Sequence, residues 1–182
     1  MMVKDRLEKY DVVLQRLTED KIEMVRNWRN DPKISQYMEY REEITSEMQK
    51  KWFVSIDNER NLYYIILYKG EEIGLINIKD IDKQELSGES GVFIYSDKYL
   101  NTDISYRAHL CLFDYFFEDL SYNEVHSHIL SSNKRAIRFS EYLGSHRVSE
   151  TEYSLLKGDY EANVNRQRFI KKYNALKSRN NE

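Results

Sequence analysis

The order of secondary structure predicted for residues 89–145 constrains this chain of 182 residues more than any other feature. The stretch reads as strand, turn, helix, strand, turn and helix. Its first strand, residues 90–95, is short and rich in β-branched and aromatic side chains, which is typical of a strand buried on both faces. A polar turn at 96–103 leads into the first helix. The alternation predicts an α/β (α+β) domain built around this stretch.

The two helices of this stretch have recognisable faces and ends. Apolar residues recur at helical spacing over 104–120, which predicts an amphipathic helix whose apolar stripe packs against a sheet. Residues 125–130 read as the second strand. Asn133 stands at the N-cap position of the second helix, and Gly144 stands where its C-terminal cap belongs.

The remaining segments add further strands and helices. In chain order, the patterns predict a strand at 12–17, a helix at 20–30, a helix after Thr45, a hairpin of strands at 62–68 and 72–78, and a closing hairpin of strands at 146–155 and 161–170. The polar tail after about residue 174 is expected to fray. We therefore predict a mixed, mostly antiparallel sheet of about seven strands with about four helices, splayed between residues 91–95 and 125–130.

Composition excludes several classes of protein. With 41% apolar and 32% charged residues, the chain is globular, and its length suits a single domain over 1–182. It holds no run of ~18 apolar residues, and its first residues are too polar for a signal peptide, so a cytoplasmic protein without membrane contact is expected. A net charge of −3 gives no bulk attraction to nucleic acid. Whether the chain forms a homodimer stays open.

Neither cysteine nor histidine indicates a metal or redox site. The single cysteine, Cys111, lies on the apolar face of a predicted helix, where it is expected to fill the core. His126 and His128 share one face of a strand, but two ligands do not make a zinc site, and no Cys-x-x-Cys or His-Glu-x-x-His motif is present. No metal is expected.

The last helix of the central stretch resembles a known family. Residues 133–144 read Asn-Lys-Arg-Ala-Ile-Arg-Phe-Ser-Glu-Tyr-Leu-Gly, which is similar to the ending N-x-x-A-i-x-l-Y-E-K-l-G-F of the GCN5-related N-acetyltransferases (GNAT). In that family a strand, a glycine-rich turn and a helix hold the pyrophosphate of acetyl-coenzyme A. The resemblance extends over about residues 12–170. It implies a GNAT-like domain that uses acetyl-CoA to acetylate a primary amine of a small molecule.

The resemblance also implies which residues contact the coenzyme. They lie at the end of a strand, in the following turn and in the last helix: Phe93, Ile94, Tyr95, Asn101, Thr102, Asp103, Ile104, Ser105, Asn133 and Arg138. Residues 100–105 read Leu-Asn-Thr-Asp-Ile-Ser where the family has glycines, although Asn101 and Asp103 tolerate positive φ. The Asp103 carboxylate would compete for amides that a pyrophosphate uses. Alternatively, Asp103 and Asn133 are simply helix N-caps.

An earlier segment resembles a narrower branch of the family. Residues 27–38 and 44–53 are similar to the RimJ/RimL-like branch, and more specifically to enzymes that acetylate an amino group on a nucleotide-linked sugar. The resemblance implies substrate contacts from Trp28, Arg29, Asn30, Tyr37, Met38 and Gln49. The guanidinium fork of Arg29 suits phosphates and carboxylates. Core packing of Trp28 and a solvated helix end for Arg29 and Asn30 are the alternatives. Protein N-terminal amines and aminoglycosides remain open as acceptors.

Two positions are candidates for catalysis. Ser140 matches the family's usual general acid, a tyrosine, and Tyr142 cannot replace it because two residues rotate a helix by ~200°. A thiol pKa of ~8.5 still makes the thiolate a tolerable leaving group, so Ser140 with a bound water could suffice. Glu89, at the head of the central strand, is the best candidate carboxylate for a general base. The alternative is that Glu89 is simply an exposed charge.

A second class of function competes with the enzyme. The chain lacks the glycines at 101, 103 and 105 and the tyrosine at 140, so it is also compatible with a non-catalytic GNAT-like binding or assembly module. Free amides around an anion at residues 101–105 would favour the enzyme.

Overall fold

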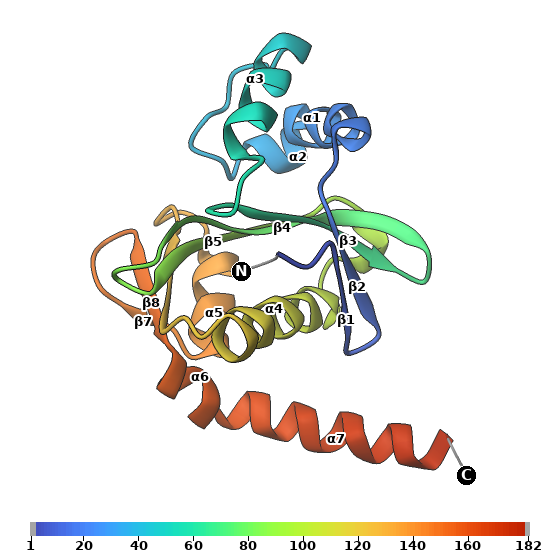
Figure 1. Cartoon of the computed structure of the whole chain (residues 1–182), viewed down its shortest axis with the longest axis vertical. Helices are drawn as coiled ribbons and strands as arrows, with labels where there is room; N and C mark the ends of the chain where they lie inside the picture. The colour runs from blue at the N-terminus through green and yellow to red at the C-terminus, as the bar shows by residue number, and fades with distance from the viewer. Residues whose placement is uncertain (1–2, 181–182) are drawn as a thin grey trace.

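The computed structural model describes residues 3–180 as one sheet with helices on both faces (Figure 1). The strands are β1 (Arg6–Lys9), β2 (Val12–Arg16), β3 (Leu62–Tyr68), β4 (Glu71–Asp82), β5 (Ser87–Ile94), β6 (Glu124–His128), β7 (His146–Arg147) and β8 (Glu152–Leu156). The helices are α1 (Ile22–Asn30), α2 (Pro32–Ser35), α3 (Ser46–Ile56), α4 (Ile104–Asp114), α5 (Lys134–Leu143), α6 (Lys157–Ala162) and α7 (Val164–Asn180). A π-helical turn, Tyr115–Asp119, extends α4.

The sheet is mixed and mostly antiparallel, as the sequence predicts. Its strand order is β1-β2-β3-β4-β5-β6-β8-β7, and β5 and β6 form the parallel pair. The predicted numbers are wrong, because the described residues form eight strands and seven α-helices. The sequence does not predict the additional first strand. In β1 three of the four residues are exposed and only Leu7 is buried, so the strand shows no alternating pattern.

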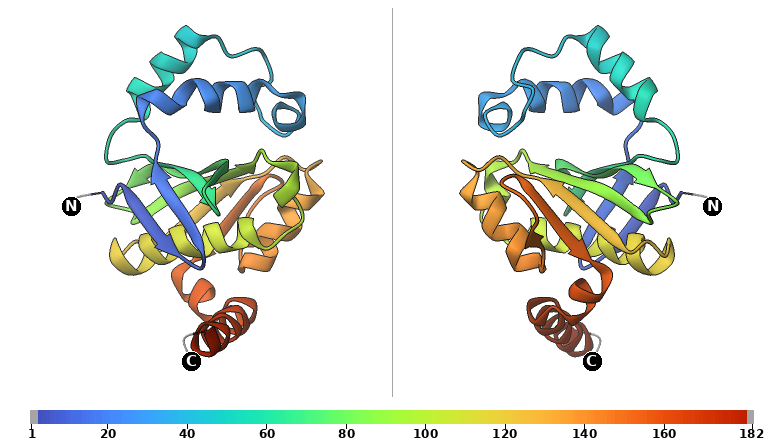
Figure 2. Two further views of the ribbon diagram at one scale, coloured as in Figure 1. Left: turned by 90° about the vertical axis from the view of Figure 1, so that its right-hand side faces the viewer. Right: turned by 90° about the vertical axis from the view of Figure 1, so that its left-hand side faces the viewer.

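Alternating residues of the strands build two cores, one on each face of the sheet. On β3, Tyr64 and Ile66 belong to the larger core under α4, whereas Tyr63 and Ile65 belong to the smaller core under α1 and α3. Figure 2 shows α1, α2 and α3 on one side of the sheet and α4 and α5 on the other. The two faces are therefore separate environments, and the buried Cys111 lies in the larger core, as expected.

Several predicted helix ends are confirmed. Thr45 Oγ1 accepts from the Met48 amide at 3.2 Å, and Asn133 Oδ1 accepts from the Ala136 amide at 3.1 Å. Gly144 adopts φ +105°, and a Cβ there would lie 2.9 Å from Asn163 Nδ2, so glycine suits this cap on two grounds.

The predicted strand at 161–170 is wrong, because this part of the chain is helical. Residues 146–156 supply a hairpin of β7 and β8, and α6 and α7 follow. Partly buried residues recur at helical spacing, at Arg166, Phe169, Ile170 and Tyr173, and over so short a stretch this period resembles alternation. Beyond residue 174, α7 continues to Asn180, and Lys177 Nζ lies 2.5 Å from Asp11 Oδ1.

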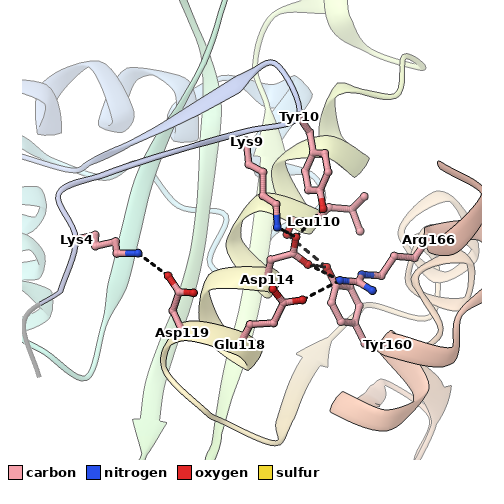
Figure 3. A network of polar contacts seen from close by, with 9 residues as sticks. All are labelled: Lys4, Lys9, Tyr10, Leu110, Asp114, Glu118, Asp119, Tyr160 and Arg166. Carbon is pink, nitrogen blue, oxygen red and sulfur yellow. Dashed lines mark hydrogen bonds and ion pairs between the residues drawn. The ribbon is translucent and has the colours of Figure 1, made fainter. Parts of the chain in front are cut away.

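A buried carboxylate joins α7 to the rest of the molecule (Figure 3). Asp114 accepts from Tyr10 Oη at 2.7 Å, from Tyr160 Oη at 2.6 Å and from Arg166 Nη2 at 2.9 Å, and it also pairs with Lys9. Burial alone would raise the pKa of Asp114, but these hydrogen bonds lower it below the ordinary value. The β1–β2 turn, α4, α6 and α7 thus meet at one charge.

We predict that Asp114→Asn lowers the free energy of unfolding by about 3 kcal/mol, because Lys9 and Arg166 lose their buried counter-charge. Urea unfolding measures the change. The control is Asp119→Asn, which removes an exposed partner of Lys4 and should cost less than about 1 kcal/mol. Equal effects of the two substitutions would contradict a central role for Asp114.

Candidate active site

The sheet opens between β5 and β6, as predicted from the sequence. The two strands pair only from Ser87 with Glu124 to Glu89 with His126. Beyond this point β5 continues to Ile94 bonded to β4 alone. One edge of residues 90–94 therefore presents backbone groups without a strand partner, and an extended ligand can pair with such an edge. Glu89 and His126 lie at the vertex of the opening.

The turn that follows β5 keeps its shape without glycines. Asn101 adopts φ +62°, the left-handed conformation that asparagine tolerates, whereas Asp103 has φ −80°. Thr102 Oγ1 accepts weakly from the Ile104 amide at 3.4 Å. The first-turn amides of α4, which include that of Ser105, have no acceptor within the helix and carry the positive end of its dipole. The turn can hold an anion at this point.

Asp103 does not cap α4 with its side chain. Its carboxylate accepts from Arg107 Nη2 at 2.9 Å, one turn along the helix, and Arg107 Nη1 reaches Asp11 Oδ2 at 3.2 Å. Burial lowers the pKa of Arg107, but the bond and charge of Asp103 raise it above its ordinary value. The Asp103 carboxylate therefore binds a cation and leaves the helix amides free, which resolves the competition expected from the sequence.

The sheet face under α1 and α3 carries a charged row at the vertex. Lys79 of β4 pairs in register with Glu89, and Glu89 pairs with His126. Lys79 Nζ lies 3.1 Å from Glu89 Oε1. Because the three residues occupy equivalent positions on neighbouring strands, their side chains project from the same face. Glu89 is half-buried and sits where the opening begins.

The next row toward α1 contains polar side chains and a glycine. Tyr63 pairs with Asn77, and Asn77 pairs with Gly91. A Cβ at Gly91 would lie 3.0 Å from Asn77 Oδ1, so glycine lets the Asn77 amide pack closely against β5. Burial raises the pKa of Tyr63 to about 12, so its hydroxyl stays neutral and able to donate.

His128 joins the far edge of this face to the segment between α2 and α3. Its Nδ1 lies 2.6 Å from Glu152 Oε1 and its Nε2 lies 2.9 Å from Glu39 Oε1. Because both carboxylates can only accept, their positions favour the protonated imidazole. The hydrogen bond with Glu152 and the charge of Glu39 raise the pKa of His128. The contact places residue 39 over β6, close to the opening.

Two of the predicted substrate residues have fixed structural partners. Asn30 donates to the Ile44 carbonyl and accepts from the Ile44 amide, each at 2.9 Å. Gln49 is buried and donates to the Ile22 carbonyl at 3.0 Å, which ties α3 to α1. These amides are thus engaged with backbone groups within the described part of the chain.

The other predicted substrate residues lie on α1 and just after α2. Trp28 is buried and stacks on Tyr95 with ring centroids 5.3 Å apart. Arg29 is half-buried beside it, and Tyr37 and Met38 lie in the segment that leads to Glu39, with Tyr37 exposed. Core packing of Trp28 is therefore seen, whereas Arg29 is not at a solvated helix end.

The predicted coenzyme residues of β5 are divided between the two faces. Phe93 packs against the smaller core with Tyr95, whereas the Ile94 side chain enters the larger one. At the opening, Phe93 and Ile94 have in common that their backbone groups lie along the free edge of β5. In α5, Arg138 is exposed, and Asn133 caps the helix. 

In α5, Ser140 and Tyr142 lie on different faces of the helix, as their spacing predicts. Ser140 is buried and Tyr142 is exposed with its ring against Tyr106, so the two lie on different faces. Tyr142 is thus directed away from the face that holds Ser140, as its spacing along the helix predicts.

Sequence reasoning missed several residues that the site contains: Glu39, Tyr63, Asn77, Lys79, His128 and Glu152. Strand alternation places Asn77 and Lys79 on one face, but the register that brings Lys79 to Glu89 comes from pairing across strands. The position of Glu39 depends on a contact with a distant strand. Local patterns do not carry this information.

Residues 3–180 contain neither a metal-binding cluster nor a membrane-spanning helix. No group of three or more His, Cys, Asp or Glu side chains there is arranged to hold a metal ion. None of the helices described is both long and apolar enough to cross a membrane.

Comparisons with known proteins identify the family. A profile of the acetyltransferase (GNAT) domain matches residues 11–146. An uncharacterised protein of Methanocaldococcus jannaschii is 24% identical over 140 residues, which are 73% of this chain and 28% of the length of that relative.

Two solved structures share the fold. One is a spermidine N-acetyltransferase from Vibrio cholerae in complex with CoA and spermine, with a TM-score of 0.75 and 15% identity over 84% of this chain and 99% of that one. The other is an aminoglycoside acetyltransferase in complex with coenzyme A, with a TM-score of 0.72 and 18% identity over 83% of this chain and 98% of that one. At these identities the likeness concerns the fold.

We predict that Asp103→Asn tightens coenzyme A binding by about 2–5-fold at low salt, because a negative charge leaves the α4 N-terminus. Titration calorimetry at two ionic strengths measures this, and salt should shrink the difference. Asp119→Asn, which removes the same charge just beyond the far end of α4, is the control. Intact binding with an unchanged dissociation constant would show that the phosphates are held elsewhere.

Proposed function

Because the chain belongs to the acetyltransferase (GNAT) domain family, whose enzymes use acetyl-CoA as cosubstrate, we propose that it moves an acetyl group from acetyl-CoA to a primary amine. The observation that carries the proposal is the parting of β5 and β6 after Glu89 and His126. The open edge of residues 90–94 suits an extended pantetheine arm, and the first turn of α4 suits its phosphates. Both features survive the loss of the family's glycines.

Acetyl-CoA supplies a thioester carbonyl carbon, which forms a bond to the amine nitrogen while the bond to sulfur breaks and its electron pair leaves with the sulfur. Glu89, at the vertex, accepts the proton that the nitrogen loses. Lys79, 3.1 Å from Glu89, holds the carboxylate in place. Ser140, at the position that matches the family's usual general acid, would hold a water that protonates the departing sulfur, and with an ordinary thiol pKa of ~8.5 this proton transfer needs little assistance.

The acceptor that we propose is an amino sugar carried by a nucleotide. The support is the resemblance of residues 27–38 and 44–53 to the RimJ/RimL-like branch, together with Arg29, which α1 brings to the acceptor side of the sheet. A phosphate matches a guanidinium fork. The two structural neighbours named above act on other amines, and the test must include such amines.

The non-catalytic module is the second candidate function. Its support is that no tyrosine stands at position 140, where a buried serine lies instead. Such a module would keep the fold but would not turn over acetyl-CoA. Binding and turnover therefore separate the two proposals.

We predict binding of coenzyme A by calorimetry, and a fall of about 100-fold or more in kcat for Glu89→Gln, because the proton acceptor is lost while the shape is kept. The coenzyme dissociation constant should not change. Glu47→Gln, which alters an exposed glutamate paired with Lys51 on α3, is the matched control. Absence of binding at millimolar coenzyme A would overturn the enzyme in favour of the module.

A further inference from the structure

We propose that the outer face of α7 is a docking surface for duplex DNA, which it contacts through the phosphate backbone without reading the base sequence. The proposal is independent of the acetyl transfer described above and is carried by the charge of this one helix. The surface lies on the side of the sheet opposite to α1, α2 and α3, beyond α4 (Figure 1).

α7 is basic, whereas the rest of the chain is acidic. Its 17 residues include six of the 28 Lys and Arg residues and none of the 31 Asp and Glu residues. The remaining chain therefore carries 22 positive against 31 negative side chains, a formal net charge of −9. The overall charge of −3, from which no bulk attraction to nucleic acid is expected, thus conceals a basic helix on an acidic body. Such a distribution turns α7 toward a polyanion and the body away from it.

The inner face of α7 lies on the body, where its two cations are neutralised. Arg166 Nη2 lies 2.9 Å from Asp114 Oδ1 and 3.0 Å from Glu118 Oε1. Lys177 Nζ lies 2.5 Å from Asp11 Oδ1. These contacts fix which side of the helix faces the solvent.

Four further cations lie on the outer face. With 3.6 residues per turn, spacings of three, four and eleven residues bring side chains to the same side of a helix. These spacings relate Arg168, Lys171, Lys172 and Arg179, all of which are exposed. Among residues 3–180, the carboxylates that reach α7 pair with its inner cations and none pairs with these four. The outer face is therefore a row of uncompensated positive charge about 16 Å long.

The aromatic residues of α7 do not suit a membrane surface. A helix that lies on a membrane turns Trp, Phe or Leu toward the lipid. Phe169 and Tyr173 instead point inward, where both rings pack edge-on against Tyr10 with centroids 5.6 and 5.4 Å away. The outer face thus lacks the apolar stripe that lipid binding requires.

A protein partner fits the outer face less well than a nucleic acid does. Protein interfaces are usually anchored by buried aromatic or aliphatic side chains. The two large apolar side chains exposed on α7, Val164 and Leu176, are about three turns apart and form no patch. The exposed side chains between the cations are polar or small: Gln167, Asn174, Ala175 and Ser178. A symmetric contact between two copies through this face would bring like charges together.

Among nucleic acids, the geometry favours duplex DNA. Single strands are bound mainly by stacking on exposed aromatic rings, which the outer face of α7 lacks. The major groove of duplex RNA is narrow and closed to side chains, whereas that of B-DNA is about 12 Å wide and admits an α-helix. α7 stands at one end of the molecule with the body on one side only (Figure 2). Its outer face can therefore approach the groove, with the flanking phosphates near the cations.

Fluorescence anisotropy of a short labelled DNA duplex of mixed sequence, titrated with the protein, tests the proposal. We expect a dissociation constant of about 10–100 µM at physiological salt, equal for a second sequence. Affinity should fall steeply with salt. Lys171→Gln/Lys172→Gln should weaken binding about 5–10-fold and lower the slope of log affinity against log salt by about 2, because two phosphate contacts are lost.

Matched variants separate the position of the charge from its amount. Lys50→Gln/Lys69→Gln removes the same charge from two exposed lysines on other elements and should leave the affinity within about 2-fold of the wild type. Lys171→Arg/Lys172→Arg keeps the charge and should keep the binding. Thermal unfolding of these variants should match the wild type, because α7 is held through its inner face.

Four results would overturn the proposal. They are the absence of duplex binding at low salt, an unchanged affinity in Lys171→Gln/Lys172→Gln, tighter binding of a single-stranded RNA than of the duplex, and binding to anionic lipid vesicles in place of DNA. Saturating coenzyme A, which also carries phosphates, should leave duplex binding unchanged. Competition between the two would assign the α7 cations to the coenzyme instead. These readouts need no turnover, so their outcome does not depend on the proposed acetyl transfer.

Discussion

The parting of two parallel strands is the constraint on which the rest of the structure depends. β5 and β6 share only the three pairs that end at Glu89 and His126, yet β5 is bonded along its length to β4 and β6 along its length to β8. Each strand is thus held by its outer neighbour, which lets the sheet stay intact while it opens. The chain crosses from β5 to β6 through α4, and the start of α4 lies close to the end of β5. The free edge of β5 and the first-turn amides of α4 therefore both provide backbone donors at the same opening.

The two faces of the sheet divide stability from chemistry. On one face the larger core and the buried Asp114 fix α4, α6 and α7, and the Asp114 carboxylate accepts from Tyr10, Tyr160 and Arg166 within the molecule. On the other face Glu89 pairs with Lys79, and among residues 3–180 the Arg29 Nε has no acceptor. The central carboxylate of one face is thus buried among its partners, whereas Glu89 on the other face stands half-buried at the opening between β5 and β6.

The sequence predicts those parts of the site that local chemistry determines. The caps at Thr45 and Asn133, the left-handed glycine at 144 and the positive φ of Asn101 follow from residue type alone, and so does the central strand. What it does not reveal depends on distant pairing: the bond of Asp103 to Arg107 needs a side-chain orientation, and Lys79 meets Glu89 only through strand register. The helix α7 was missed because a short apolar period can be read in two ways.

The central claim is that the coenzyme arm pairs with β5 inside the opening. Hydrogen exchange measured by mass spectrometry, with and without coenzyme A, tests it directly. The account predicts slower exchange of amides in residues 90–95 and in the first turn of α4, with little change in β1 and β2. Protection confined to another region, such as the shallow groove lined by Arg16, Phe53 and Asn58, would contradict it.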